Sequence, residues 1–304
     1  MSKIKTALRF IGTPGKMITH IGDNGLLNWI PDKLYLKMAF YGEKKTKLNL
    51  ENPTTFNEKL QWLKIYDRNP YYSQLVDKLA VKKIVSQKIG KEHVIPTLAV
   101  WDNAAAIDLS ILPDQFVLKC THDSGSVIVC KNKNTINKEK MLKRIDGNMR
   151  KDPFWLGREW PYRNVKPRII AEEMLTDVND GDLKDYKFFC FNGVVKCFKI
   201  DFDRFTGHRA NYFTPDGELL RFGEAVCPPD YDRVIPLPQN LNQMIKFAEI
   251  LSTGIPFVRV DFYESLNKVY FGEITFFPAS GFGTFIPEEW DVILGNWLFL
   301  PSIK

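Results

Sequence analysis

Cysteine and histidine are both scarce in this chain. Its 304 residues include five cysteines and four histidines. The cysteine count is odd and no Cys-x-x-Cys spacing occurs, which argues against a disulfide framework or a zinc centre and favours buried free thiols in a reducing compartment. No Ser-His-Asp pattern is present either, so we do not expect catalysis by an activated protein nucleophile.

Long apolar runs are missing as well. No run reaches the roughly 18 residues that a membrane-spanning helix needs. The basic start of the chain, residues 1–9, is not followed by the apolar core of a signal peptide. Arginine-rich runs and nucleic-acid-binding motifs are also missing. We therefore expect a cytoplasmic protein that does not bind nucleic acid.

The residues that are present are typical of a soluble globular protein, with 44% hydrophobic and 26% charged residues. The net charge of +6 suits an anionic ligand or an acidic membrane surface. Near the N-terminus, basic and apolar residues alternate, which fits either peripheral contact with an anionic membrane or a helix that covers a lobe. These residues are Lys3, Ile4, Lys5, Leu8, Arg9, Phe10 and Lys16.

The stretch 257–277 predicts two strands joined by a turn. A period of two places Arg259 and Asp261 on one face of the first strand, and Glu273 and Thr275 on one face of the second. If these faces coincide, two carboxylates converge in an apolar setting. Buried carboxylates need compensation, which magnesium or manganese would supply. An ordinary hairpin with a solvated face is the alternative.

A polar turn lies between two further predicted strands, 116–120 and 127–130. The turn, 121–126, contains Gly125. The backbone amides of such a turn can hold a phosphate, with Lys119 beside it. It is not a Walker A loop, because no Gly-Lys-Ser/Thr follows. A plain hairpin explains it equally well.

Apolar residues recur at helical spacing in several segments. Thr55 and Glu58 form a capping box at the start of one helix. Residues 71–90 predict a single helix that contains Lys78 and ends at Gly90. Further helices are predicted at 4–10, 29–41, 137–150, 241–251 and 290–300, and further strands at 94–101, 168–175 and 197–202. Residues 185–195 predict a hairpin with an Asn-Gly turn at 192–193.

The stretch 154–165 is rich in aromatic and charged residues. Such a stretch can stack on sugar rings while its charges orient hydroxyls or a carboxylate, or it can be a packing loop. The candidate acceptor-binding residues are Arg158, Glu159, Trp160, Tyr162 and Ser280.

Several motifs occur in the order found in the ATP-grasp superfamily, and residues 33–287 resemble its TupA-type branch of teichuronopeptide and capsular polysaccharide biosynthesis. The motifs are TFNEKLQWLK, DKLAVKK, FVLKCTHDSGS, REWPYRNVKPRIIAEEML, DYKFFCFNG, VRVDFY and EITFFPASG. The resemblance implies an α+β ATP-grasp fold that holds ATP between two α+β lobes. The implied segments are a helical N-terminal extension (1–70), a preceding lobe (71–112), subdomain A with the glycine loop (113–171), and subdomain B with the metal site and a C-terminal helix (172–304).

The resemblance also implies which residues bind ATP. Lys78 and Lys119 correspond to phosphate-contacting lysines, and Asp185 corresponds to the acid that holds the ribose. The other correspondences are the glycine loop and the hinge whose backbone reads adenine. The full set is Lys78, Lys119, His122, Ser124, Gly125, Ser126, Glu172, Glu173, Met174, Leu175 and Asp185.

The remaining correspondences concern the reacting groups. Arg259 corresponds to an arginine that steadies charge in the tetrahedral intermediate. Thr275 stands where many members have asparagine, so the third metal ligand is a shorter, neutral one. The implied catalytic residues are Arg259, Lys187 and Arg209, and the implied metal ligands are Asp261, Glu273 and Thr275.

These roles imply a ligase that uses ATP and magnesium, or manganese, to make an acyl phosphate that an amine then attacks. The implied substrates are a uronic-acid-containing saccharide or lipid-linked glycan and a small amine, such as an amino acid or amino alcohol. The implied location is cytoplasmic, with possible peripheral contact at the inner face of a bacterial membrane. The alternatives are a glycosyltransferase, suggested by Asp201-Phe202-Asp203, and a non-catalytic ATP-binding relative.

Overall fold

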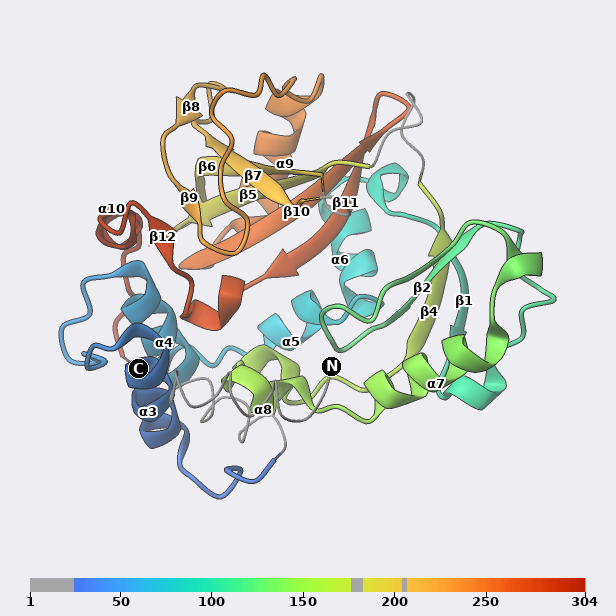
Figure 1. Ribbon diagram of the computed structural model, residues 1–304, viewed down its shortest axis with the longest axis horizontal. Coiled ribbons are helices and arrows are strands. Elements are labelled where there is room, and N and C mark those ends of the chain that lie inside the picture. The colour runs from blue at the N-terminus through green and yellow to red at the C-terminus, as the bar shows by residue number, and fades with distance from the viewer. Residues whose placement is uncertain (1–24, 176–182, 204–206, 304) are drawn as a thin grey trace.

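The computed structural model describes residues 25–175, 183–203 and 207–303, which form two large sheets and a short two-stranded one, with helices between and around them (Figure 1). The predicted helix at 4–10 and the basic residues before position 17 lie outside the described residues. Within the described ranges, no helix combines the length and apolar character needed to cross a membrane.

The smaller sheet has four antiparallel strands in the order β1-β4-β2-β3. Its first strand lies in the segment expected as the preceding lobe, and its strand β4 ends two residues inside 172–304, so the sheet draws on three of the expected segments. The predicted strand at 94–101 begins only after Pro96. The strands are β1 (Thr97–Trp101), β2 (Phe116–Cys120), β3 (Ile128–Cys130) and β4 (Ile169–Glu173).

The larger sheet has six antiparallel strands in the order β11-β10-β5-β6-β7-β8. The predicted Asn-Gly turn joins β5 to β6, with positive φ at both Asn192 and Gly193. The strands are β5 (Asp185–Phe191), β6 (Val194–Phe202), β7 (Arg209–Phe213), β8 (Leu219–Leu220), β10 (Phe257–Ser265) and β11 (Lys268–Thr275). A two-stranded sheet pairs β9 (Gly223–Glu224) with β12 (Phe285–Ile286).

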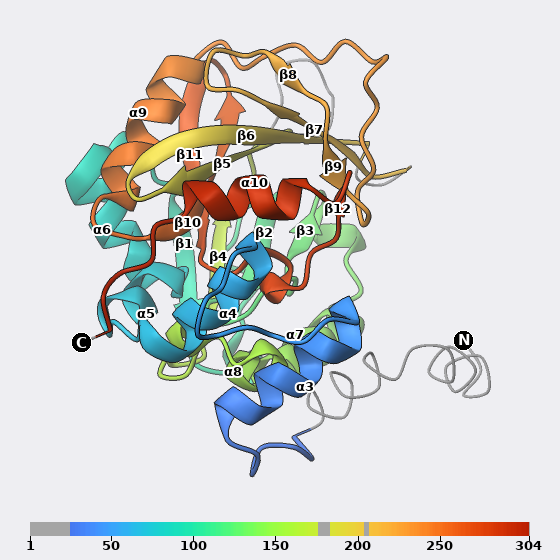
Figure 2. The ribbon, with the colours of Figure 1, turned by 90° about the vertical axis from the view of Figure 1, so that its left-hand side faces the viewer.

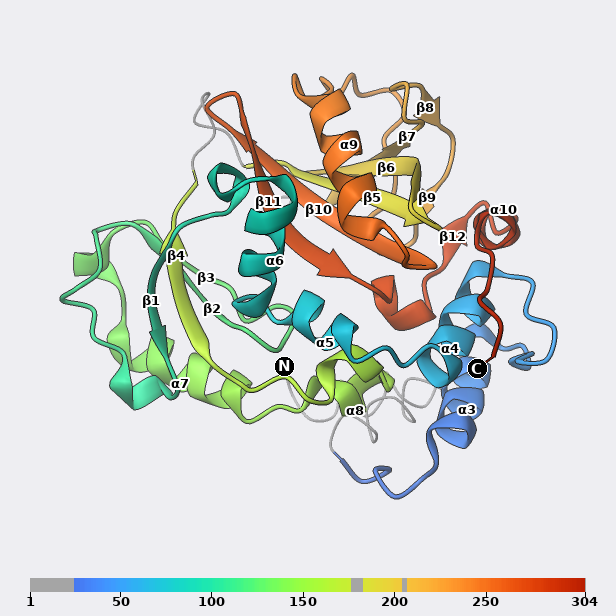
Figure 3. The same ribbon diagram turned by 180° about the vertical axis from the view of Figure 1, so that it is seen from behind.

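Helix α9 packs against one face of the larger sheet, as the rear view shows (Figure 3). Phe247 of α9 contacts the ring of Phe262 on this face. The alternating charged residues of β5 and β10 therefore occupy the other face. The helices are α3 (Asp32–Lys44), α4 (Phe56–Tyr66), α5 (Tyr71–Val76), α6 (Ala80–Ile89), α7 (Lys138–Met149), α8 (Pro153–Gly157), α9 (Leu241–Ser252) and α10 (Trp290–Trp297).

The hairpin of β10 and β11 has the register that the alternation required. Asp261 pairs with Glu273, and Arg259 pairs with Thr275. The register shifts just beyond Asp261, and a Cβ atom on Gly272 would lie 3.0 Å from the Asp261 carbonyl oxygen. Glycine is thus the residue that fits this close approach. The two polar faces therefore coincide, which is the condition that the sequence alone left open.

The prediction of one continuous helix over 71–90 is wrong. The structure contains α5 and α6, with Asp77, Lys78 and Leu79 between them. Asp77 Oδ1 accepts hydrogen bonds from the backbone N–H groups of Leu79 at 2.8 Å and Ala80 at 3.2 Å. This side-chain cap competes with continued helix hydrogen bonding and restarts the helix. Lys78 therefore lies in an irregular joint.

The two sheets have separate hydrophobic cores. The larger core is rich in phenylalanine and includes residues of α4, α9 and the six-stranded sheet. The smaller core joins the four-stranded sheet to α7 through residues such as Leu118 and Ile145. All five cysteines are buried and free, which confirms the prediction made from their number and spacing.

Candidate active site

The polar side chains of the β10–β11 hairpin gather around one guanidinium group. Arg259 donates from Nε to Asp261 Oδ1 at 2.7 Å and from Nη2 to Asp261 Oδ2 at 2.6 Å. The same Nη2 lies 3.1 Å from both Glu273 Oε1 and Thr275 Oγ1. The Thr275 hydroxyl also lies 3.2 Å from Glu273 Oε1. The structure therefore brings together all four residues that the alternation singled out.

Burial changes the protonation of these carboxyl groups. It raises the pKa of Asp261 to about 6, against the opposing effects of Arg259 and Lys187. Burial acts in the same direction on Glu273, but Arg259, Lys78 and Lys187 together outweigh it, and the pKa of Glu273 falls below its usual value. Two neighbouring carboxylates and a hydroxyl are hard oxygen donors, and the cost of ionising buried Asp261 favours a nearby cation. The donor set fits magnesium, and manganese shares the preference.

Lys187 joins the hairpin to the neighbouring strands. It stands opposite Asp261 in the pairing of β5 with β10. Its Nζ donates to Asp185 Oδ2 and to Asp201 Oδ2, both at 2.7 Å. The carboxylate of Asp185, predicted to hold a ribose, is thus buried beside the carboxylate cluster.

Further along the same face, Lys199 forms a second ion-pair centre, which the sequence analysis did not predict. Its Nζ donates to Glu224 Oε2 at 2.9 Å, and the Tyr212 hydroxyl donates to Glu224 Oε1 at 2.9 Å. The sequence does contain one indication of this centre. Lys199 and Asp201 are two residues apart in a strand, so their side chains lie on the same face as Lys187.

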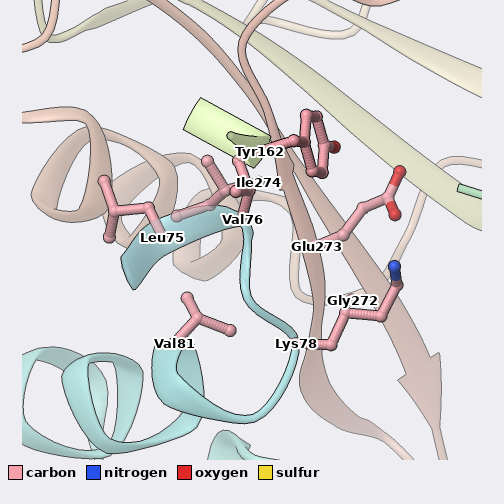
Figure 4. Close-up of a pocket in the computed structure, with 8 residues that line it drawn as sticks. All are labelled: Leu75, Val76, Lys78, Val81, Tyr162, Gly272, Glu273 and Ile274. Carbon is pink, nitrogen blue, oxygen red and sulfur yellow. The ribbon is translucent and has the colours of Figure 1, made fainter. Parts of the chain in front are cut away.

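Lys78 lies between the two sheets. Its backbone N–H donates to the Thr121 carbonyl at 3.0 Å, and its Nζ donates to the Asp123 carbonyl in the turn after β2. Its ammonium group also interacts with Glu273 of the larger sheet. Figure 4 shows Lys78 and Glu273 converging beside Tyr162 at one pocket. The pocket is otherwise lined by Leu75, Val76, Val81, Gly272 and Ile274.

The turn after β2 is closed by its own side chains. Ser126 Oγ accepts from the Cys120 N–H at 2.8 Å and donates to Asp123 Oδ1 at 2.6 Å. Ser124 and Gly125 form the exposed tip. Gly125 has a φ of +90°, and no residue other than its two chain neighbours has an atom within 4 Å of the place where its Cβ would be. The tip therefore has open space beside its backbone amides, as an anion-binding turn requires.

Glu172 of β4 binds two lysines of different elements. Its Oε2 lies 2.5 Å from Lys119 Nζ in β2, and its Oε1 lies 2.5 Å from Lys82 Nζ in α6. Burial pushes the pKa of Glu172 upward, but the two lysines outweigh it and hold that pKa below its usual value. Lys82 was missed because nothing in the motif DKLAVKK distinguishes it from Lys83.

The predicted hinge spans the end of β4. Glu172 belongs to the strand, and the Glu173 N–H donates to the Pro96 carbonyl at 3.1 Å. Met174 and Leu175 follow the last residue of the strand. These two residues therefore lie beyond the ladder, where a backbone group can meet a ligand.

Two of the candidate acceptor residues pack elsewhere. Buried Arg158 donates to the Leu27 carbonyl at 2.8 Å and lies 3.3 Å from Asp32 Oδ1. The ring of Trp160 lies 5.5 Å from the guanidinium of Arg68, which itself binds Asp32 at 2.6 Å. The structure places both residues around the start of α3 and does not bring them to the hairpin carboxylates.

Glu159, Tyr162 and Ser280 do lie near the pocket. Burial raises the pKa of Glu159, although Lys64 and a hydrogen bond with Ser280 oppose it. Burial, Glu159 and Glu273 together raise the pKa of Tyr162. Lys64 Nζ donates to the Ser280 carbonyl at 2.8 Å and lies 3.1 Å from its hydroxyl. Burial lowers the pKa of this lysine to about 8.

Two other predicted residues have different surroundings. In the pairing of β6 with β7, Asp201 stands opposite Ala210, so the side chain of Arg209, one residue earlier, lies on the opposite face of the sheet from Asp201. There Arg209 donates a hydrogen bond to the Pro229 carbonyl at 3.2 Å. His122 is buried, with Nε2 at 3.2 Å from the Lys151 carbonyl. The catalytic role of Arg209 and the ATP-binding role of His122 stay predictions, which these contacts do not support.

The Asp-x-Asp sequence does not form one carboxylate pair. Asp201 is buried against Lys187, whereas Asp203 lies beyond the end of β6 with a φ of +52° and pairs with Arg233. The two acids have separate partners, so this observation does not favour a nucleotide-sugar site.

Known structures resemble the chain only distantly. A D-alanine–D-alanine ligase from Bacillus anthracis complexed with ATP is 13% identical, with 66% of this chain and 53% of that chain covered and a TM-score of 0.38. D-cycloserine synthetase DcsG is 16% identical, with 74% and 69% covered and a TM-score of 0.39. The chain spans 53% to 56% of the first three structures it matches. No curated protein sequence matches it.

The family model described as TupA-like ATPgrasp matches residues 58–299. This range contains both sheets, the turn after β2 and the β10–β11 hairpin. The mixed helix-and-sheet architecture, with a glycine turn facing a carboxylate-bearing sheet, agrees with the ATP-grasp fold that the motifs predicted. The chain therefore belongs to the TupA-like ATP-grasp family.

Proposed function

We propose that this protein is an ATP- and magnesium-dependent ligase that joins a carboxylate to an amine through an acyl phosphate. The observation that carries the proposal is the register of the β10–β11 hairpin. It pairs buried Asp261 with partly exposed Glu273 on one face of the sheet, and Lys78 approaches Glu273 from the joint between the sheets. Acids for a cation and lysines for phosphates thereby meet in one place, as phosphoryl transfer requires.

The chain's own groups would divide the work between binding and charge compensation. Asp261, Glu273 and the Thr275 hydroxyl would hold magnesium, which when bound neutralises phosphate charge. Lys78 and Lys119 would contact phosphates, since both lie beside the turn after β2. Arg259 would then be freed from the carboxylates to stabilise negative charge on the reacting carbonyl.

The substrates are the finer part of the proposal. We propose that the carboxylate belongs to a uronic acid of a surface polysaccharide or of its lipid-linked precursor, and that the amine is an amino acid or amino alcohol. Membership of the TupA-like family supports this choice. Tyr162 would contact the acceptor, because it lines the pocket beside Glu273, and Glu159 would assist it, because its carboxyl group interacts with Tyr162. The reaction would take place in the cytoplasm.

The test is an ADP-release screen of uronic-acid saccharides against amines, with magnesium present. Release should require an acid and an amine together and stop when magnesium is chelated. Lys119→Ala and Glu273→Ala should each lower the rate by about a hundredfold or more, since each removes a charge used in the transition state.

Matched controls are Lys143→Ala and Glu139→Ala on the exposed side of α7. Both should keep the rate of the unchanged protein, and circular dichroism should show that all four variants are folded. Undiminished ADP release in Lys119→Ala and Glu273→Ala would overturn the proposal. ATP binding without turnover for any acid and amine pair would point instead to a non-catalytic relative.

A further inference from the structure

One surface of the molecule has features that the proposed ligase site does not use. Helix α3 lies at the edge of the molecule (Figure 2). Large side chains are exposed on it and just before it: Trp29 is 81% exposed, Tyr41 57% and Leu34 52%. All seven tryptophans are described, and Trp29 alone among them is classed as exposed. Exposed aromatic residues at this density mark an interaction surface.

Lysines accompany these side chains. At 100° per residue, Lys33 and Lys37 fall on the arc of α3 that also carries Leu34 and Tyr41, and Lys45 directly follows the last residue of the helix. The three lysines are exposed. We name the set of Trp29, Lys33, Leu34, Lys37, Tyr41 and Lys45 the α3 outer face.

The acidic residues of α3 are kept away from this face. Asp32 turns inward and pairs with Arg68 at 2.6 Å and with Arg158 at 3.3 Å. Glu43 is half-buried and falls on the inner arc of the helix. The outer face is therefore positively charged, with aromatic groups between its lysines.

We propose that the α3 outer face binds the anionic surface of a lipid bilayer. Tryptophan and tyrosine favour the boundary between headgroups and acyl chains, and lysines are attracted to anionic headgroups. A second copy of the chain is disfavoured as the occupant, because an isologous contact would press the same lysines against each other. The proposal does not depend on the reaction that the enzyme catalyses.

Helix α7, which is also basic, shows why charge alone is not the argument. Helix α7 exposes Lys140, Lys143 and Arg144, but its large apolar residues Met141 and Ile145 are buried. It offers cations without exposed aromatic groups. It therefore provides a matched control for electrostatic attraction without interfacial insertion.

The position of the face links it to the candidate acceptor segment. Arg158 fixes the turn after α8 to the start of α3 through Asp32 and the Leu27 carbonyl. Four residues later, Tyr162 lines the pocket beside Glu273. A bilayer bound to the α3 outer face would thus lie close to the segment from Arg158 to Tyr162, which leads to the pocket. A lipid-linked acceptor anchored in that bilayer could reach the pocket along this segment.

The test uses the full chain and phosphatidylcholine vesicles with or without phosphatidylglycerol. Co-sedimentation should occur with the anionic vesicles and weaken at high salt. Brominated lipid in those vesicles should quench Trp29 fluorescence, and Trp29→Phe should remove the quenching. Because each lysine near an anionic surface strengthens binding roughly fivefold, Lys33→Glu with Lys37→Glu should weaken it at least about 30-fold.

Lys140→Glu with Lys143→Glu is the charge-matched control and should retain binding. The proposal is overturned if this control loses binding as completely as the α3 variant, or if the α3 variant still binds. It is also overturned if Lys5→Glu with Arg9→Glu abolishes binding while the α3 variant retains it. Trp29-dependent self-association without vesicles would assign the face to a second copy instead.

Discussion

Cys120 is the residue whose position most invites a catalytic interpretation. It follows Lys119 in β2, at the start of the turn that faces the candidate metal ligands. Its thiol is fully buried, and burial, assisted by Asp123, raises its pKa to about 11. Because the thiolate is the nucleophile, a thiol with this pKa is a poor one at neutral pH. Its position is explained by packing in the smaller core.

This burial predicts slow thiol chemistry in the native protein. Burial also raises the pKa values of Cys190 and Cys227 to about 12 each. At pH 8 about one Cys120 in a thousand would be thiolate, so native alkylation by iodoacetamide should be slow and should accelerate about tenfold per pH unit. Mass spectrometry should find all five cysteines modified after unfolding in urea. A single cysteine modified within seconds at neutral pH would contradict this prediction.

The residues that could be predicted are those whose neighbours follow from strand alternation. Arg259 and Asp261 share a face by their spacing alone, and the pairing with β11 is then set by a short hairpin. The partners of Glu172 could not be predicted, since Lys82 and Lys119 come from a helix and another strand. Arg158 has the composition of a ligand contact, yet it is bound by α3, which lies over a hundred residues away in the chain.

At the scale of elements, the joint between α5 and α6 shows a side chain overriding an apolar pattern. The stripe of apolar residues from Leu75 to Ile89 has helical spacing throughout, so periodicity predicts no interruption. Asp77 interrupts it by capping Leu79 and Ala80. The interruption releases Lys78 from the helix and lets its backbone bond to Thr121.

Removing this cap should destabilise the protein and disturb the position of Lys78. Asp77→Ala should lower the free energy of unfolding by about 0.5–2 kcal/mol in urea denaturation, the usual cost of a lost cap. Asp77→Asn is the matched control, because asparagine caps as well as aspartate and should retain nearly full stability. Equal losses in both variants would show that the charge of Asp77 matters more than its hydrogen bonds.

Helix α4 contains most of the motif TFNEKLQWLK, none of whose residues is a predicted ligand contact. Its polar side chains have a structural role instead. Gln61 Nε2 donates to the Ser280 and Gly281 carbonyls at 3.1 and 2.7 Å, and Asn57 Nδ2 donates to the Gly283 carbonyl at 2.9 Å. Ala279 and Ser280 both have positive φ, which costs a non-glycine residue free energy. The polar side of TFNEKLQWLK therefore holds a strained loop directly after the candidate metal ligand in β11.

At the scale of the whole molecule, polar contacts made by Lys78 link two sheets that have separate hydrophobic cores. Their hydrophobic cores are distinct, with Leu118 in the smaller and Ile200 in the larger. Lys78 contacts the turn of the smaller sheet through main-chain atoms and interacts with Glu273 of the larger one. Separate cores with a polar junction favour independent opening of the two parts.

Substitutions in each core should therefore act locally. Leu118→Ala should cost about 2–5 kcal/mol and raise amide hydrogen exchange in residues 97–173, leaving exchange in 185–200 and 257–275 nearly unchanged. Ile200→Ala, equally buried in the larger core, is the matched control and should show the reverse pattern. Under the proposed function, magnesium and ATP would bridge the junction, so adding both should slow the extra exchange in Leu118→Ala. If Leu118→Ala instead accelerates exchange uniformly over both sheets, the two cores unfold as one unit. The polar junction would then couple the stability of the two sheets as completely as a shared core would.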